Sequence, residues 1–126
     1  MIEALDLVDL ENATQSRLVF WDEQVYRQEI ERIFARTWQF LTHESLIPKN
    51  GDFVTAYIAE DAVIVSRQKD GTIRAFLNSC THRGNTVCHA DSGNARGFVC
   101  SYHGWVYSQD GKLADVPLEE RCYHNA

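Results

Sequence analysis

Two short segments decide how this chain folds, Cys80-Thr81-His82 and Cys100-Ser101-Tyr102-His103, and each pairs one cysteine with one histidine. Seventeen residues, 83–99, separate the first histidine from the second cysteine. Thiolate sulfur and imidazole nitrogen are both common metal ligands in proteins. The segments therefore predict a metal site with two Cys and two His ligands, formed where two loops converge.

This set of four ligands suits two kinds of centre. A Rieske [2Fe–2S] cluster takes two cysteines on one iron and two histidines on the other. Structural zinc also takes four such ligands, but about two to four residues usually separate its paired ligands. Only one residue lies between Cys80 and His82, and Gly84 and Gly104 follow the two histidines, where they let the backbone turn tightly. These features favour the Rieske cluster and leave structural zinc as the alternative.

The histidines set the charge of such a cluster. Two ferric ions, two sulfides and two thiolates cancel in charge when the other ligands are neutral imidazoles, whereas four thiolates would leave a dianion. The neutral centre accepts an electron more readily, and its potential lies at about −150 to +300 mV. The ligand set therefore predicts one-electron transfer.

Composition narrows the class of protein. The 126 residues carry 12 basic and 18 acidic side chains, a formal charge of −6, and 44% of them are hydrophobic. This length fits one compact domain, and the negative charge argues against nucleic acid or an anionic membrane as a partner. The acidic N-terminal region lacks a signal-peptide pattern, and no apolar stretch is long enough to span a bilayer. We therefore expect a cytoplasmic protein.

Hydrophobic spacing predicts one helix followed by strands. Residues 22–37 place apolar side chains at helical spacing, with Asp22 as the N-cap. From Gly51 onward, residues rich in Val, Ile, Thr and aromatic side chains predict strands over 53–59, 62–68 and 72–79. Turn residues predict a bend at 91–94 and hairpins at 69–71 and 109–111, the last flanked by strands over 105–108 and 112–114. The expected fold class is mainly β, a small antiparallel structure with the ligand loops at strand ends, preceded by an N-terminal α-helix.

A resemblance to a known family is carried by two runs, Asn78-Ser79-Cys80-Thr81-His82-Arg83-Gly84-Asn85 and Ala95-Arg96-Gly97-Phe98-Val99-Cys100-Ser101-Tyr102-His103-Gly104-Trp105. They resemble the Rieske domain of the large (α) subunit of bacterial aromatic ring-hydroxylating dioxygenases of the naphthalene and biphenyl kind. The similarity extends upstream through 33–38 and downstream to Val116-Pro117. The resemblance implies that Cys80, His82, Cys100 and His103 hold the [2Fe–2S] cluster.

Respiratory Rieske proteins resemble this chain in the ligands alone. They carry an additional cysteine in each cluster loop, joined as a disulfide, where this chain has Asn85 and Tyr102. The resemblance therefore implies a lower-potential centre of the dioxygenase kind.

The resemblance also implies partners and a further domain. In this family the α subunit takes electrons from a ferredoxin or reductase, ultimately from NAD(P)H, and passes them to a mononuclear Fe(II) that dihydroxylates an arene with O2. That iron commonly belongs to a neighbouring α subunit, and a small β subunit is expected in the assembly. Beyond His103 the chain offers only His124. We therefore expect the catalytic iron domain to be absent and the chain to be a fragment.

The expected organisation is an N-terminal segment and helix, 1–40, packing on a Rieske domain, 41–126. We expect His82 and His103 at the exposed side of the centre, Cys80 and Cys100 deeper, and a hydroxyl from Tyr102 or Ser101 on a cluster sulfur. The remaining cysteines, Cys88 and Cys122, are expected to be ordinary thiols. A free-standing Rieske ferredoxin and a zinc module are the alternative functions.

Overall fold

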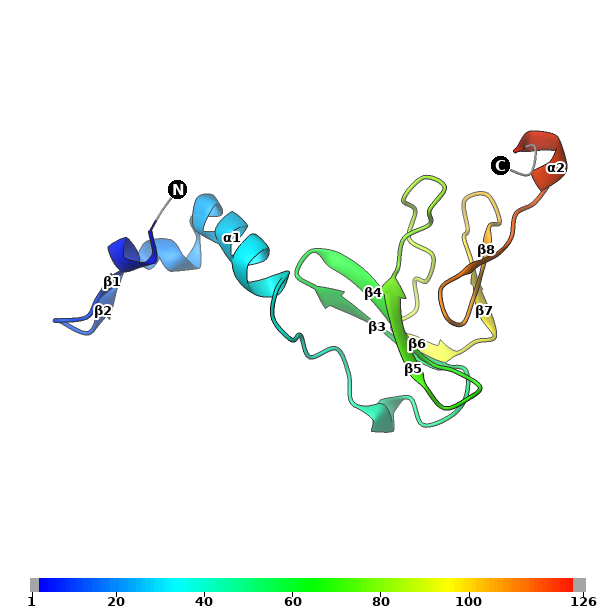
Figure 1. Cartoon of the computed structure of the whole chain (residues 1–126), viewed down its shortest axis with the longest axis horizontal. Helices are drawn as coiled ribbons and strands as arrows, with labels where there is room; N and C mark the ends of the chain where they lie inside the picture. Colours follow the sequence, from blue (N-terminus) through cyan, green and yellow to red (C-terminus); the bar gives the residue numbers. More distant parts are fainter. Residues whose placement is uncertain (1–2, 124–126) are drawn as a thin grey trace. The chain divides into compact units, whose positions relative to one another are not determined.

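The computed structural model describes residues 3–123 of the chain. It divides into two compact units, Met1–Gln39 and Phe40–Ala126. Figure 1 shows the ribbon coloured along the sequence, with the first unit in blue and cyan. The predicted packing of residues 1–40 on the Rieske domain stays a prediction, and each unit is described by itself.

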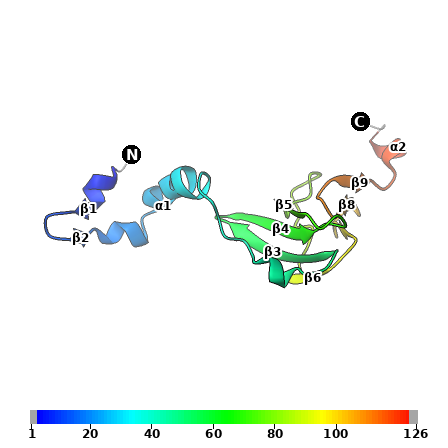
Figure 2. The same ribbon diagram turned by 60° about the horizontal axis from the view of Figure 1, so that its bottom comes forward.

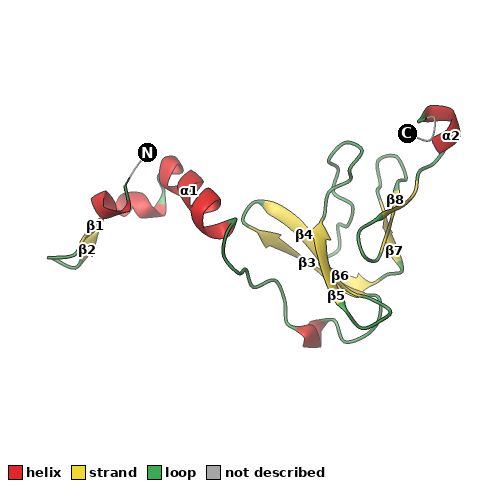
Figure 3. Ribbon diagram, in the orientation of Figure 1, coloured by secondary structure: helices red, strands yellow, loops and turns green. Residues whose placement is uncertain are grey.

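The first unit consists of short helices and one small hairpin, which Figure 3 colours by type. Strands β1 and β2 pair antiparallel over two residues each. The elements in chain order are η1 Ala4–Leu7, β1 Val8–Asp9, β2 Thr14–Gln15, η2 Arg17–Phe20, α1 Glu23–Glu29 and η3 Ile30–Phe34. A small apolar pocket of about 330 Å³ lies in this unit, with Val19, Val25 and Ile33 among its lining residues.

The predicted N-cap is confirmed, but the predicted length of the helix is wrong. The Asp22 carboxylate accepts from the N–H groups of Gln24 and Val25 at 2.9 and 3.1 Å, as an N-cap does. The α-helix ends at Glu29 and continues as a single π-helical stretch to Phe34. The N–H of Ala35 donates to the carbonyl of Ile30 at 3.0 Å, the five-residue spacing of a π-helix, and beyond this stretch the carbonyl of Ile33 accepts both the N–H and the hydroxyl of Thr37.

The second unit contains two antiparallel sheets, seen from two sides in Figures 1 and 2. The first sheet has the order β5-β4-β3-β6, and the second has the order β7-β8-β9. Their bounds are β3 Asp52–Ile58, β4 Asp61–Arg67, β5 Ile73–Leu77, β6 Ser92–Asn94, β7 Gly97–Val99, β8 Val106–Ser108 and β9 Leu113–Asp115. Two short helices, η4 Glu44–Leu46 and α2 Glu119–Cys122, complete the unit. The predicted class, mainly antiparallel β, is confirmed.

One predicted turn is a strand. Residues 91–94 were expected to form only a bend, yet Ser92–Asn94 form β6 and pair antiparallel with Asp52–Val54 of β3. Gly93 lies against the ring of Phe53, where an added Cβ would come within 3.0 Å of it. The small side chains that suggest a turn therefore also permit close packing at this edge of the sheet.

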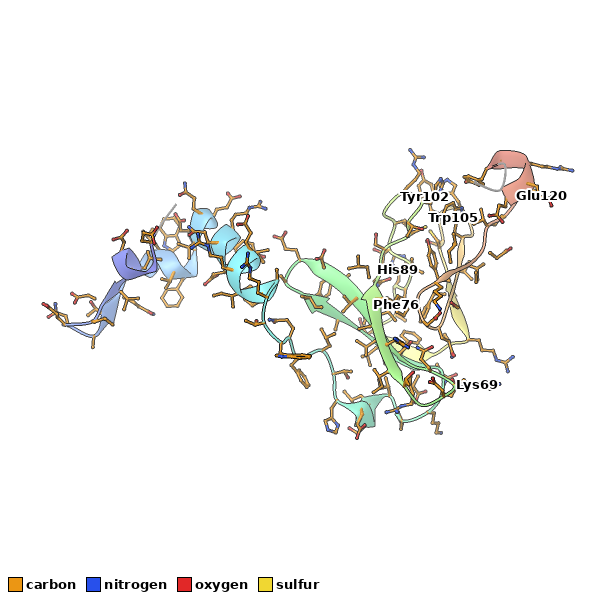
Figure 4. All side chains as sticks on the ribbon, in the orientation of Figure 1. Lys69, Phe76, His89, Tyr102, Trp105 and Glu120 are labelled. Carbon is orange, nitrogen blue, oxygen red and sulfur yellow. The ribbon has the colours of Figure 1, made fainter. Side chains whose placement is uncertain are left out.

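Aromatic side chains join the two sheets in one core. Phe98 of β7 packs edge-on against Phe53 of β3, with ring centroids 5.3 Å apart, and against Phe76 of β5 at 5.8 Å. Figure 4 labels Phe76 between the sheets. The same buried cluster contains Cys80, Cys100 and Tyr107. The ligand loops are therefore rooted in the hydrophobic core.

In the part of the chain that the structure describes, no helix is both long and apolar enough to cross a membrane.

Candidate metal centre

The two ligand loops repeat one pattern of backbone hydrogen bonds. The N–H of Cys80 donates to the carbonyl of Asn85 at 2.8 Å, and the N–H of Cys100 donates to the carbonyl of Trp105 at 2.8 Å. The N–H of the fifth residue of each loop, Gly84 or Gly104, returns to the carbonyl of the cysteine at 2.8 or 3.0 Å. Each loop is thus a closed six-residue turn that begins at its cysteine.

Glycine is needed at the fifth position of both turns. Gly84 and Gly104 have φ angles of +72° and +75°, in the left-handed region that side chains with a Cβ disfavour. Both glycines were expected from the sequence to allow tight turns, and their backbone angles agree. The turns let each loop reverse direction within six residues and present its histidine at the tip.

The histidine occupies a different position in each turn. His82 is the third residue of the first loop, and His103 is the fourth residue of the second. The Nδ1 atoms of the two rings lie 3.1 Å apart, and the rings meet edge to face with centroids 4.7 Å apart. Both loops therefore form the same kind of turn, but the histidine is the third residue of one and the fourth of the other, which corresponds to the Cys-x-His and Cys-x-x-His spacings.

Burial separates the sulfurs from the imidazoles. Cys80 and Cys100 are 3% and 1% exposed, whereas His82 is half-buried and His103 is exposed. This is the arrangement expected from the sequence. The thiols lie at the core side of the site, and the imidazoles lie toward its surface.

Hydrogen bonds act on the ionisation of Cys100. Burial opposes loss of its proton, but N–H groups of Tyr102 and His103 and the side chains of Cys80 and Asn85 together outweigh that effect. The pKa of the Cys100 thiol therefore lies below its ordinary value. A lowered pKa favours the thiolate, which is the form that binds metal.

The hydroxyl that reaches a sulfur belongs to Tyr107, not to Tyr102 or Ser101 as the sequence suggested. Its oxygen accepts the N–H of Thr81 at 2.9 Å and lies 3.2 Å from Cys80 Sγ, to which it donates. Burial and the neighbouring Cys80 sulfur raise the pKa of Tyr107, so the phenol keeps its proton. Tyr107 lies on β8, 27 residues after Cys80, and local sequence gave no signal for the contact.

Aromatic rings surround the imidazoles. Trp105 stacks on His82 with centroids 4.8 Å apart and an interplanar angle of 11°, and Tyr123 meets the edges of both rings. Tyr102 lies beside His103 with centroids 3.8 Å apart. Figure 4 labels Tyr102 and Trp105 near the ends of the ligand loops. Burial and the nearby His103 and Arg83 charges lower the pKa of His82, which favours the neutral, metal-binding imidazole.

Asn78 anchors the first ligand loop from beneath. Its side-chain oxygen accepts the N–H groups of Val87 and Cys88 at 3.1 and 2.8 Å, and its amide donates to the Cys88 carbonyl at 2.7 Å. This buried side chain thus holds Val87 and Cys88, which follow the loop, against the residue that precedes it. This role of Asn78 could not be predicted from the sequence, because a hydrogen bond across ten residues leaves no periodic signal.

The side chains fit a two-iron cluster. Two buried thiols in contact and two facing imidazoles form two pairs, as a cluster with one iron for each pair requires. Cys80, Cys100, His82 and His103 would hold it, and when bound it supplies a one-electron redox centre. The other two cysteines, Cys88 and Cys122, lie outside both ligand loops and are free thiols.

Two further histidines lie outside the ligand loops. His89 is exposed and follows Cys88 in the segment between the two loops. His124 lies outside the described residues.

The fold and the site define a small antiparallel β domain whose two loops present paired Cys and His ligands. The model of the Rieske [2Fe-2S] domain matches residues 37–124, about two thirds of the chain. The chain therefore belongs to the Rieske [2Fe–2S] domain family.

Curated relatives narrow the resemblance. The chain is 56% identical over 121 residues to the large oxygenase component of the naphthalene 1,2-dioxygenase system of Pseudomonas aeruginosa, covering 96% of this chain and 27% of that protein. It is 52% identical over 118 residues to the α subunit of biphenyl 2,3-dioxygenase of Rhodococcus jostii, covering 94% and 26%. The expected resemblance to dioxygenase α subunits is confirmed, and the chain spans about a quarter of their length.

A solved structure agrees in fold. Naphthalene 1,2-dioxygenase with indole bound in its active site superposes with a TM-score of 0.88 at 52% identity, over 95% of this chain and 27% of that one. The Rieske fold expected from the sequence is thereby confirmed.

Proposed function

We propose that this chain is the electron-transfer domain of an aromatic ring-hydroxylating dioxygenase α subunit. The observation that carries the proposal is the separation of the four ligands into buried thiols, 1–3% exposed, and imidazoles at the surface. A partner can approach the imidazole edges, while the core excludes water from the sulfurs. Because both loops are closed turns rooted in the core, the ligands are held in place when the charge of the centre changes.

The proposed route of electrons has one donor side and one acceptor side. A ferredoxin or reductase supplies the electron, and a mononuclear Fe(II) site in a further domain receives it, in a neighbouring α subunit of an assembly that includes a small β subunit. Dihydroxylation of an arene with O2 takes place at that second site. Relatives named for naphthalene and for biphenyl match this chain at 56% and 52% identity, so the matched region does not select the arene. We place the protein in the cytoplasm.

A free-standing Rieske ferredoxin is the second candidate. The four ligands would serve a mobile carrier equally well. The first unit, 1–39, favours the α subunit, because both relatives match the chain over at least 94% of its length and thus include this unit.

Electron paramagnetic resonance of the dithionite-reduced protein tests the proposal, with iron, sulfide and zinc assayed in the same sample. We expect two irons and two sulfides per chain and a rhombic signal of a His-ligated [2Fe–2S] centre. His82→Cys and His103→Cys should abolish that signal or convert it to the signal of a four-cysteine cluster. A zinc-loaded, signal-free protein would contradict the proposal.

A further inference from the structure

The side chain of Asn85 reaches from the first ligand loop to the second. Its Nδ2 atom lies 2.9 Å from the Thr86 carbonyl, 3.4 Å from Ser101 Oγ and 3.6 Å from Cys100 Sγ. The backbone carbonyl of Asn85 accepts the N–H of Cys80 at 2.8 Å. One residue therefore contacts both cysteines, Cys80 through its backbone and Cys100 through its amide.

The two protons of the amide have distinct acceptors. The short distance to the Thr86 carbonyl assigns one N–H to that oxygen, which fixes the side chain within its own loop. The other N–H is then directed toward the second loop, where the Cys100 sulfur and the Ser101 hydroxyl are the acceptors. Asn85 is half-buried, so solvent competes only weakly for this proton.

The two cysteines have matching donors. Tyr107, which follows the second loop, donates to Cys80 of the first. Asn85, which ends the first loop, donates to Cys100 of the second. Each sulfur thus receives one side-chain bond from the opposite side of the site, and the two bonds cross between the loops.

We propose that Asn85 is a positioning residue that ties the two ligand loops together and raises the reduction potential of the centre through its bond to Cys100. The inference rests on the proposed function. Hydrogen bonds to an anionic acceptor are stronger than bonds to a neutral one. Reduction makes the whole centre more negative, which strengthens the Asn85 bond to the Cys100 sulfur, so the bond stabilises the reduced state more than the oxidised state.

Three variants of the full chain test the proposal. Asn85→Asp has the same shape but replaces the donor with a carboxylate oxygen, and Asn85→Leu removes the donor at similar volume. Asn50→Asp is the control for charge. Asn50 lies far from the ligand loops. The next residue, Gly51, donates its N–H to the carbonyl of Arg67 at the end of β4. Asn78, just before the first ligand loop, donates its N–H to the carbonyl of Ala62 near the start of the same strand. Five residue steps along the strand, about 17 Å, separate Ala62 from Arg67.

The midpoint potential from spectroelectrochemistry is the deciding measurement, at equal iron content. We expect Asn85→Leu to lower the equilibrium constant for reduction by up to about tenfold, which is about 59 mV for one electron. Asn85→Asp should lower it further, because its charge also repels the added electron, and Asn50→Asp should change it least. This readout separates an electronic role from a purely structural one.

The rate of iron loss reports how firmly Asn85 holds the two ligand loops together. We expect Asn85→Leu and Asn85→Asp to lose iron to a chelator faster than the wild type and Asn50→Asp. Potentials that equal that of the wild type in both Asn85 variants, or a fall as large in Asn50→Asp, would overturn the proposal. A wild-type chain with zinc or without a [2Fe–2S] signal would instead contradict the proposed function, before any variant is compared.

Discussion

The Tyr107 side chain differs from that of phenylalanine only by its hydroxyl group, and this hydroxyl donates to Cys80 Sγ. Tyr107→Phe keeps the ring in the core and removes that bond. We expect the reduction equilibrium to fall by up to about tenfold, or about 59 mV, because the lost bond favours the more negative, reduced state. Potentiometry with Tyr57→Phe as the control checks this, since Tyr57 is 70% exposed on β3. Equal shifts in both variants would contradict it.

Residue types and spacing were enough to predict the four candidate ligands. Cysteine and histidine have few other reasons to recur in two pairs followed by glycine, and the loops that contain them are local. The residues that act on the sulfurs could not be predicted in the same way. Tyr107 and Asn85 reach cysteines 27 and 15 residues away, and only the pairing of the sheets brings them there.

The hairpins at 69–71 and 109–111 offer a matched pair of glycines. Gly71 and Gly111 occupy corresponding turn positions with φ angles of +86° and +81°. A Cβ on Gly71 would meet open space, whereas a Cβ on Gly111 would collide with the ring of Phe76. Replacing either glycine by alanine therefore strains the backbone to a similar degree, but only the replacement of Gly111 also causes a steric clash.

Thermal or denaturant unfolding of the two alanine variants should separate these costs. We expect Gly71→Ala to lower the free energy of unfolding by about 1–2 kcal/mol, the cost of left-handed backbone for a residue with a Cβ. Gly111→Ala should lower it by about 1–3 kcal/mol more, because Phe76 must move from the contact that joins the sheets. Similar losses in both variants would show that Phe76 adapts freely.

The second hairpin turn should also respond to acid. Bonds from Ser108 and Lys112 lower the pKa of Asp110 from 3.8 to about 2. Because the folded pKa is the lower one, the ionised carboxylate contributes stability above about pH 4, and this contribution is lost as the pH falls toward 2. Asp110→Asn should therefore reduce the difference in stability between pH 5 and pH 2.5. Urea unfolding at both pH values checks this, and an unchanged difference would contradict it.

At the scale of elements, sequence periodicity predicted the strands better than the helix end. The long strands β3, β4 and β5 were expected within one or two residues of their observed bounds, because β-branched and aromatic residues alternate or cluster there. The change to π-helix at Ile30 and the strand at Ser92–Asn94 were missed. The strand at Ser92–Asn94 forms because β6 pairs with β3, a contact that periodicity does not contain. The helical spacing of apolar residues over so short a stretch does not distinguish α-helical from π-helical bonding.

The division of the whole chain into two units predicts where a protease should cleave it first. Residues 38–43 lie outside helices and strands, and Trp38 and Phe40 are fully or largely exposed, at 103% and 84%. Chymotrypsin cleaves after aromatic residues in segments that open easily. Other exposed aromatic residues, such as Tyr57 and Tyr102, lie in a paired strand or a closed ligand loop, where the backbone is less accessible.

Limited digestion of the iron-loaded chain should therefore cut first at Trp38 or Phe40. We expect the larger product to keep the visible absorption of its cluster, because the four candidate ligands and the core that holds them all belong to the second unit. Mass spectrometry identifies the cut, and the absorption spectrum follows the cluster. Protection of this segment would instead support the packing of residues 1–40 on the Rieske domain, since a packed segment cannot enter a protease. Loss of the absorption together with the cut would show that the first unit is needed to hold the centre.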